Sequence, residues 1–159
     1  MANGSAAHIR IIVDADACPV KDAIERAARR HGVKVLMVTA TAMRDRGEGV
    51  EVVRIPSGPD AVDDWIVERC EPGDIVVTQD IPLAAAAIAK GAQVIENRGE
   101  VLGASNIGVR LAMRDLTMEL RDTGVIDPMT GGPRPLGQRD RNRFAQALGR
   151  LLDGARSRS

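Results

Sequence analysis

Aspartates occur in the first half of the chain at positions where their carboxylates could act together. Asp14 and Asp16 follow one apolar run, and Asp80 follows another. Asp63 and Asp64 lie near the start of a helical pattern. Carboxylates that come together raise each other's pKa values unless a cation lies between them. Because oxygen ligands suit Mg²⁺ and Mn²⁺, the sequence predicts an acidic pocket that binds one of these cations.

Alternating strand and helix patterns are expected to position these aspartates. Apolar, β-branched runs predict strands over residues 8–13, 33–39, 50–55, 74–78 and 92–96. Apolar residues at helical spacing predict helices over residues 20–30, 61–70, 82–90, 107–121 and 139–152. Asp60 is expected to be the N-cap of the second helix. The alternation indicates one α/β domain, with an open, mostly parallel sheet of about five strands flanked by helices.

The order of these elements predicts that the aspartates meet at one edge of the sheet. Asp14 and Asp80 each follow a predicted strand, and open parallel sheets bind ligands beyond the carboxyl ends of their strands. A helix that leads into a parallel strand begins at that same edge, which would bring Asp63 and Asp64 there. Asp16 lies two residues after Asp14, so in an extended chain both side chains would point to one side and could share a cation.

The composition suits a single compact domain. The 159 residues are 44% hydrophobic and 28% charged, which is enough to bury an ordinary core. The aromatic fraction is only 1%, which argues against a nucleic-acid site built on base stacking. We expect the folded domain to span residues 8–153, with disordered ends at residues 1–7 and 154–159.

The sequence predicts a cytoplasmic location. Its longest apolar runs fall short of the roughly 20 residues that span a membrane. Residues 1–7 lack the charged and then apolar layout of a signal peptide. Cys18 and Cys70 form no CxxC motif and no metal-binding spacing, so we expect reduced thiols. A membrane partner is not expected, and a homo-oligomer is compatible with the sequence.

Acidic and basic side chains are unevenly distributed although the net charge is zero. Residues 1–80 contain 10 basic and 14 acidic side chains, whereas residues 131–159 contain 7 and 2. Four arginines surround a segment rich in glycine and proline and could bind the phosphates of RNA or another nucleic acid: Arg134, Arg139, Arg141 and Arg143. The alternative interpretation is a solvated, arginine-rich surface helix.

Five segments carry motifs that together resemble one known family. They are VDADACPVK (13–21), GPDAVDDWI (58–66), DIVVTQDIPLA (74–84), LAMRDL (111–116), and GGPRPL with DRNRF (131–144). In this order, and over nearly the whole chain, they resemble the bacterial YaiI/YqxD family, which is also called DUF188 or UPF0178. More loosely, the chain is similar to PIN-like nucleases.

The similarity to PIN-like proteins implies a metal-dependent nuclease. In those nucleases a strand-end aspartate, an acidic residue on a later helix and a Thr-x-Asp after the fourth strand hold Mg²⁺ or Mn²⁺. The matching positions are Asp14, then Asp63 or Asp64, then Thr78 and Asp80. The resemblance therefore implies a single PIN-like domain that hydrolyses phosphodiesters, with RNA as the favoured substrate. Thr78 would orient Asp80 or the attacking water.

Two other functions are open at this point. A haloacid-dehalogenase-like phosphatase would use Asp14 as nucleophile and Asp16 as general acid. Against it, Cys18 stands where that class has Thr or Val, and Lys90 is the one candidate, a poor one, for the lysine that holds the phosphate. A non-catalytic module would bind a metal or a basic partner in the acidic pocket and RNA at the arginine-rich end. Such a module would keep its RNA affinity when Asp14 and Asp80 are replaced by Asn.

Overall fold

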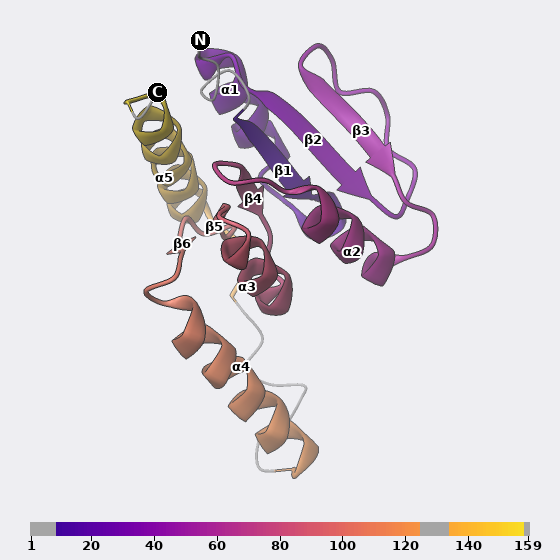
Figure 1. The fold of residues 1–159 in the computed structure, drawn as a ribbon, viewed down its shortest axis with the longest axis vertical. Coiled ribbons are helices and arrows are strands. Elements are labelled where there is room, and N and C mark those ends of the chain that lie inside the picture. Colours follow the sequence, from indigo (N-terminus) through magenta and orange to yellow (C-terminus); the bar gives the residue numbers. More distant parts are fainter. Residues whose placement is uncertain (1–8, 125–133, 158–159) are drawn as a thin grey trace.

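A six-stranded sheet forms the centre of the computed structural model, which describes residues 9–124 and 134–157. The strands are β1 (Arg10–Asp14), β2 (Lys34–Thr39), β3 (Val50–Arg54), β4 (Ile75–Val77), β5 (Gln93–Ile95) and β6 (Val101–Leu102). Their order is β3-β2-β1-β4-β5-β6, and every neighbouring pair is parallel except β5 with β6 (Figure 1). The predicted α/β class with an open, mostly parallel sheet is confirmed.

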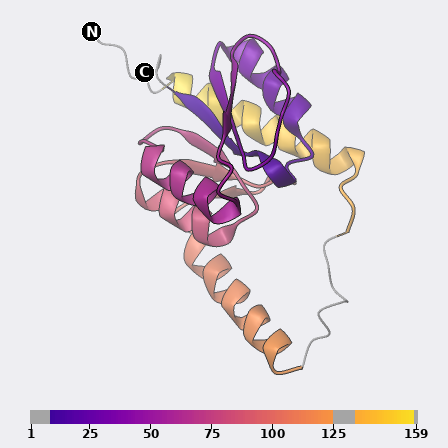
Figure 2. The same ribbon diagram turned by 90° about the vertical axis from the view of Figure 1, so that its right-hand side faces the viewer.

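Helices cover both faces of this sheet (Figure 2). They are α1 (Lys21–His31), α2 (Pro59–Arg69), α3 (Ile81–Ala89), α4 (Ile107–Asp122) and α5 (Gln138–Ser157). Side chains of α1 and α5 share one hydrophobic cluster with Ile11 and Val13 of β1. Those of α2 and α3 share a second cluster with Ile12. Successive side chains of β1 therefore pack alternately into these two clusters, which explains why the sequence of the strand is an uninterrupted apolar run.

Glycines set the ends of two helices. α1 ends at Gly32, whose φ of 67° is in the left-handed region. α2 begins after Gly58, with Pro59 as its first residue. The predicted N-cap role of Asp60 is therefore wrong. Asp60 lies in the first turn, because proline needs no partner for a backbone N–H and allows the helix to begin earlier.

The boundaries of two further elements differ from the prediction. The sequence does not predict β6, a two-residue strand that forms by antiparallel pairing with β5 rather than from a pattern of its own. α5 continues to Ser157, so the expected disordered tail is wrong for residues 154–157, and the burial of Ala155 explains the longer helix. Residues 1–7 and most of the linker rich in glycine and proline lie outside the described residues.

Cys18 and Cys70 are free, as predicted, and both are buried. Burial raises the pKa of the Cys18 thiol, which makes it a poor nucleophile. Within the described part of the chain, no helix combines the length and the apolar character needed to cross a membrane.

Candidate active site at the carboxyl edge of the sheet

The carboxyl edge of the sheet brings together the ends of β1 and β4. The chain runs outward from β1 through β2 and β3, and then returns to the other side of β1 at β4. Strand order therefore reverses between β1 and β4, which is where open α/β sheets bind ligands. Asp14 ends β1, and residues 78–80 follow β4 at the same edge, just beyond the paired Val13 and Val77.

Thr78 links these two strand ends through its buried hydroxyl group. The hydroxyl donates to Asp14 Oδ2 at 2.9 Å and accepts the backbone N–H of Asp80 at 3.0 Å. Asp80 Oδ1 in turn accepts the backbone N–H of Leu83 at 2.9 Å, which makes Asp80 the N-cap of α3. Sequence reasoning missed this capping role, although Pro82 in the first turn is a signal for a helix start.

α2 contributes a third carboxyl group, that of Asp63. It lies within hydrogen-bonding reach of Asp80, and burial, together with the charges of Asp80, Asp14 and Asp60, raises its pKa to about 6. Burial also raises the pKa of Asp14, and the charge of Asp80 adds to that increase. Asp14, Asp63 and Asp80 are named the acidic triad below. Each member is partly buried.

In the part of the chain that the structure describes, the acidic triad has no positively charged partner. Among the described residues, no lysine, arginine or histidine forms an ion pair with any of its members. The acidic side chains that are buried elsewhere do have arginine partners: Glu25 with Arg46, Asp74 with Arg10, Glu96 with Arg110, and Asp140 with Arg98 and Arg134. The triad is thus a place where a bound cation would relieve unfavourable charge.

The donor atoms of the triad suit a hard divalent cation. Its carboxylates and the Thr78 hydroxyl offer only oxygen, the donor that Mg²⁺ and Mn²⁺ prefer. In residues 9–124 and 134–157, no three acidic, histidine or cysteine side chains are close enough together to hold a metal by themselves. The residues therefore fit a cation that takes two carboxylates and completes its shell with water, as Mg²⁺ commonly does.

Asp16 makes its contacts at the end of β2. Its Oδ1 accepts the hydroxyl groups of Thr39 and Thr41, and its Oδ2 accepts the N–H of Ala40 at 2.8 Å. Burial acts to raise the pKa of Asp16, but these hydrogen bonds outweigh it and the pKa is lowered. The expectation that Asp16 points to the same side as Asp14 assumed an extended chain. That assumption is wrong, because a short 3-10 helix follows Asp14 directly.

The two adjacent aspartates of α2 are in different environments. Asp63 is partly buried, whereas Asp64 is exposed. One step along an α-helix rotates the side chain by about 100°, so the two carboxylates cannot face the same neighbour. Asp63 is the one that interacts with Asp80 and Asp14.

The start of α5 lies near this edge of the sheet. Arg141 Nη1 donates to the carbonyl oxygen of Pro19, in the turn before α1, at 2.9 Å. Further along both helices, His31 Nε2 lies 2.9 Å from Asp153 Oδ1. α5 therefore runs parallel to α1, and both helices begin on the side of the sheet where β1 ends.

The predicted phosphate-binding arginines divide into two groups. Arg134 binds Asp140 with both terminal nitrogens, at 2.6 and 3.0 Å, and Arg98 binds the same carboxylate at 2.7 Å. Arg139 and Arg143 are exposed on the first turns of α5. Sequence reasoning missed the role of Asp140, since its position in the first turn of a helix predicts only a favourable helix dipole interaction.

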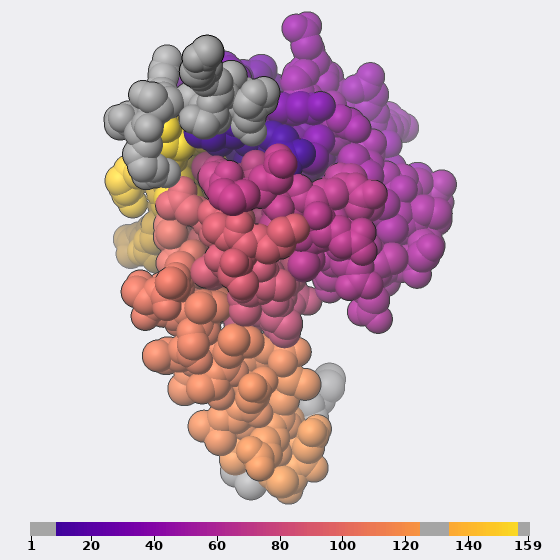
Figure 3. Space-filling model, in the orientation of Figure 1, coloured from indigo at the N-terminus to yellow at the C-terminus, as the bar shows by residue number. Residues whose placement is uncertain are grey.

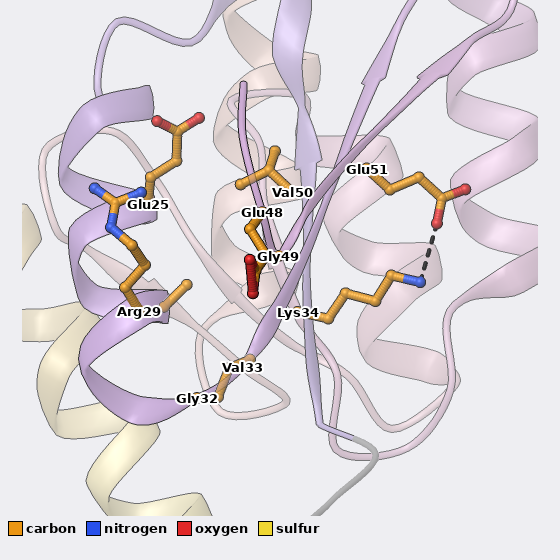
Figure 4. Close-up of a pocket in the computed structure, with 10 residues that line it drawn as sticks. Glu25, Arg29, Gly32, Val33, Lys34, Glu48, Gly49, Val50 and Glu51 are labelled. Atoms are coloured by element: carbon orange, nitrogen blue, oxygen red, sulfur yellow. Dashed lines mark ion pairs between the residues drawn. The ribbon is translucent and has the colours of Figure 1, made fainter. Parts of the chain in front are cut away.

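A groove of about 800 Å³ lies at the opposite, amino edge of the sheet (Figure 4). The C-terminal half of α1 and the starts of β2 and β3 line it, with Arg29, Lys34 and Glu48 among the side chains. Lys34 pairs with Glu51 across its rim at 3.0 Å. No predicted site residue is among the described residues that line this groove. The unpaired charge of the triad, rather than cavity size, therefore identifies the candidate site.

Comparisons with known proteins agree with the motifs. The model described as "Uncharacterized BCR, YaiI/YqxD family" matches residues 12–154. A UPF0178 protein of Cereibacter sphaeroides is 49% identical over 144 residues, covering 89% of this chain and 88% of the relative. A UPF0178 protein of Parvibaculum lavamentivorans is 47% identical over 149 residues, covering 93% and 96%. No solved structure matches the chain. The chain belongs to the YaiI/YqxD family.

Proposed function

We propose that the protein is a PIN-like nuclease of the cytoplasm that uses Mg²⁺ or Mn²⁺ to hydrolyse phosphodiester bonds, with RNA as the favoured substrate. The observation that carries this proposal is the acidic triad at the point where strand order reverses. It is partly buried, it consists of oxygen donors only, and among the described residues it has no ion-pair partner. A structural role would not require carboxylates to be held together against their repulsion.

The residues of the site have separate roles in this proposal. Asp14 and Asp63 bind the cation, because each has a raised pKa that a bound divalent ion would lower again. Asp80 uses Oδ1 to cap α3, and its Oδ2 would bind the cation or its water. Thr78 positions Asp14 by donating to its Oδ2. When bound, the cation would supply an activated water and neutralise charge on the phosphodiester.

Arginines near the site would hold the nucleic acid. Arg139 and Arg143 are exposed on the first turns of α5, which begins near the edge that holds the acidic triad. Guanidinium groups bind phosphates without reading the base sequence. Arg134 contributes less in this proposal, because Asp140 already neutralises its charge.

The contacts of Asp16 favour the nuclease over the phosphatase. A haloacid-dehalogenase mechanism needs the second aspartate as a general acid, and a general acid works best when its pKa is raised toward neutrality. Asp16 instead accepts three hydrogen bonds and has a lowered pKa. Its carboxylate therefore stays ionised and ties the turn after β1 to the end of β2.

Calorimetry followed by cleavage assays tests the proposal. Mn²⁺ is titrated into the wild-type protein and into Asp14→Asn, and both are then incubated with labelled RNA, labelled single-stranded DNA and a generic phosphatase substrate. We expect Mn²⁺ binding and RNA cleavage by the wild type, with both lost in Asp14→Asn. No binding and no turnover would contradict the proposal. Turnover of the phosphatase substrate alone would favour the phosphatase, and RNA affinity without turnover in both proteins would favour the non-catalytic module.

A further inference from the structure

α4 differs from the other helices in how little of it is covered. Of its 16 residues, all within the described part of the chain, none is buried. Figure 1 and Figure 2 show it extending away from the sheet, and the space-filling view shows it as a projection from the body of the molecule (Figure 3). Among the described residues, its contact with the core is at its beginning, where Ile107 and Leu111 pack against the cluster that contains α3.

Large apolar side chains form a stripe along the uncovered side of α4. Val109 is 66% exposed, Met113 is 55% exposed and Leu116 is 48% exposed. Leu120, which is half-buried, continues the series, so the spacing alternates between four and three residues and places all four on one face. Single exposed apolar residues are normal on protein surfaces, but a continuous stripe of this kind marks an interaction site. These four residues are named the apolar stripe.

Charges of opposite sign flank the apolar stripe. With a rotation of about 100° per residue, one flank carries Arg110, Arg114 and Arg121. The other flank carries Asp115, Glu119 and Asp122. Arg110 is held by Glu96, whereas Arg114 lies 3.4 Å from Asp115 in an exposed pair on the same helix. Exposed pairs of this kind are weak, so these side chains can exchange partners with a neighbouring molecule.

We propose that α4 is a dimerisation helix and that the apolar stripe packs against the same stripe of a second copy of this chain. The two helices would run parallel about a twofold axis along their length. In that arrangement the basic flank of each copy lies beside the acidic flank of the other. In an antiparallel pair, flanks of like charge would meet, so the charge pattern selects the parallel dimer.

The size of the stripe sets the expected strength of the dimer. A single pair of 16-residue helices buries less than the roughly 1,200 Å² at which stable interfaces begin. We therefore expect a reversible monomer–dimer equilibrium that depends on protein concentration. High salt should weaken it, because part of the specificity comes from exposed ion pairs.

Cysteine cross-linking tests the geometry with a closely matched control. The chain has two cysteines, Cys18 and Cys70, and both are buried. A parallel pair brings each stripe residue close to its own copy, so Leu116→Cys should form an intermolecular disulfide under mild oxidation. Met118 has nearly the same exposure, 45%, but lies on the opposite face, so Met118→Cys should form no intermolecular disulfide. Equal cross-linking of the two variants, or none in either, would overturn the proposal.

Sedimentation velocity tests the association without a covalent trap. The wild type should show a dimer fraction that grows with concentration, and Met113→Asp should raise the dissociation constant by about tenfold or more. Met118→Asp should leave that constant unchanged, and circular dichroism checks that both variants keep their helix content. A wild type that is monomeric at every concentration would overturn the proposal. A monomer that Met113→Asp destabilises would do the same, since the stripe would then be covered by its own chain.

Discussion

Asp140 and Asp63 show two opposite ways to place a carboxylate in this protein. Asp140 is 1% exposed, yet hydrogen bonds from Arg134 and from the backbone of Gly137, with the charge of Arg98, hold its pKa well below the usual range. Asp63 is less buried, yet burial and the neighbouring carboxylates raise its pKa to about 6. The partner, rather than the depth of burial, decides which form of the carboxyl is stable.

This difference separates the structural acids from those that we propose to bind a metal. The fully buried acids with an arginine partner join distant parts of the fold, as Asp140 does between the start of α5 and the residues after β5. The members of the acidic triad come from β1, α2 and the end of β4, and they repel one another. A protein keeps such an arrangement when the cluster binds something positive, which is the physical basis of the proposed metal site.

The largest expected effect is on catalysis. Asp14→Asn removes a negative charge from the centre of the acidic triad but keeps the side chain's size. We expect the rate of RNA cleavage in Mn²⁺ to fall by about 100-fold or more. Thermal unfolding should change little, because the asparagine can still accept a hydrogen bond from Thr78. A rate within a few-fold of wild type would show that Asp14 does not take part in the reaction.

The second-largest expected effect is on the free energy of unfolding, when the arginine-paired carboxylate of Asp140 is replaced. Asp140→Asn leaves the guanidinium groups of Arg98 and Arg134 without their carboxylate. The folded-state pKa of Asp140 is depressed, so its stabilisation is present above the unfolded pKa and is lost as the pH falls through the folded pKa. Denaturant unfolding should therefore show a larger loss for Asp140→Asn at neutral pH than at acid pH. A loss that does not change with pH would argue against the ion pairs as its cause.

In the metal-free protein, replacing Asp63 is expected to raise the free energy of unfolding, by less than replacing Asp140 lowers it. Its folded-state pKa is raised from 3.8 to about 6, so the folded state loses stability as the pH rises from below 4 through 6. Solvent screening reduces the cost to about 1 kcal/mol at neutral pH. Asp63→Asn should therefore unfold at higher denaturant than wild type at neutral pH in EDTA, and the difference should vanish in acid. A variant less stable than wild type at neutral pH would mean that Asp63 is a structural acid.

The smallest expected effect is on nucleic-acid binding. Replacing Arg139 and Arg143 with alanine should weaken RNA binding and reduce the salt dependence of its affinity by about one to two counterions. Arg150→Ala is the matched control, because Arg150 is exposed on the same helix but further from the candidate site. Fluorescence anisotropy at low and high salt measures both quantities. If the wild type, the double variant and Arg150→Ala show equal salt dependence, Arg139 and Arg143 do not bind RNA phosphates.

The order of elements and the edge that holds the aspartates follow from the sequence. The sequence predicts Asp14 and Asp80 at the ends of their strands, because apolar β-branched runs mark buried strands and parallel connections fix where those strands end. Whether Asp63 or Asp64 faces the other carboxylates depends on how α2 is rotated about its axis against the sheet. The helical pattern of this segment does not specify that rotation. The rotation of α2 is set by its packing against the rest of the fold.

Other features depend on contacts between residues far apart in the chain. Arg98 and Asp140 are separated by 42 positions, and nothing local in either segment predicts that they meet. Asp16 turns to the end of β2 because a 3-10 helix interrupts the extended chain, which the motif does not reveal. The apolar pattern of α4 also does not predict its exposure, since the same pattern is typical of a helix packed on a core.

Thermal unfolding with and without Mn²⁺ tests the central claim most directly, by comparing wild type, Asp63→Asn and Asp64→Asn. The two substitutions remove the same charge from adjacent positions of α2, but only Asp63 interacts with the other members of the acidic triad. We predict that Mn²⁺ raises the unfolding temperature of wild type and of Asp64→Asn and leaves that of Asp63→Asn unchanged. Equal stabilisation of all three proteins, or of none, would contradict a metal site at the acidic triad.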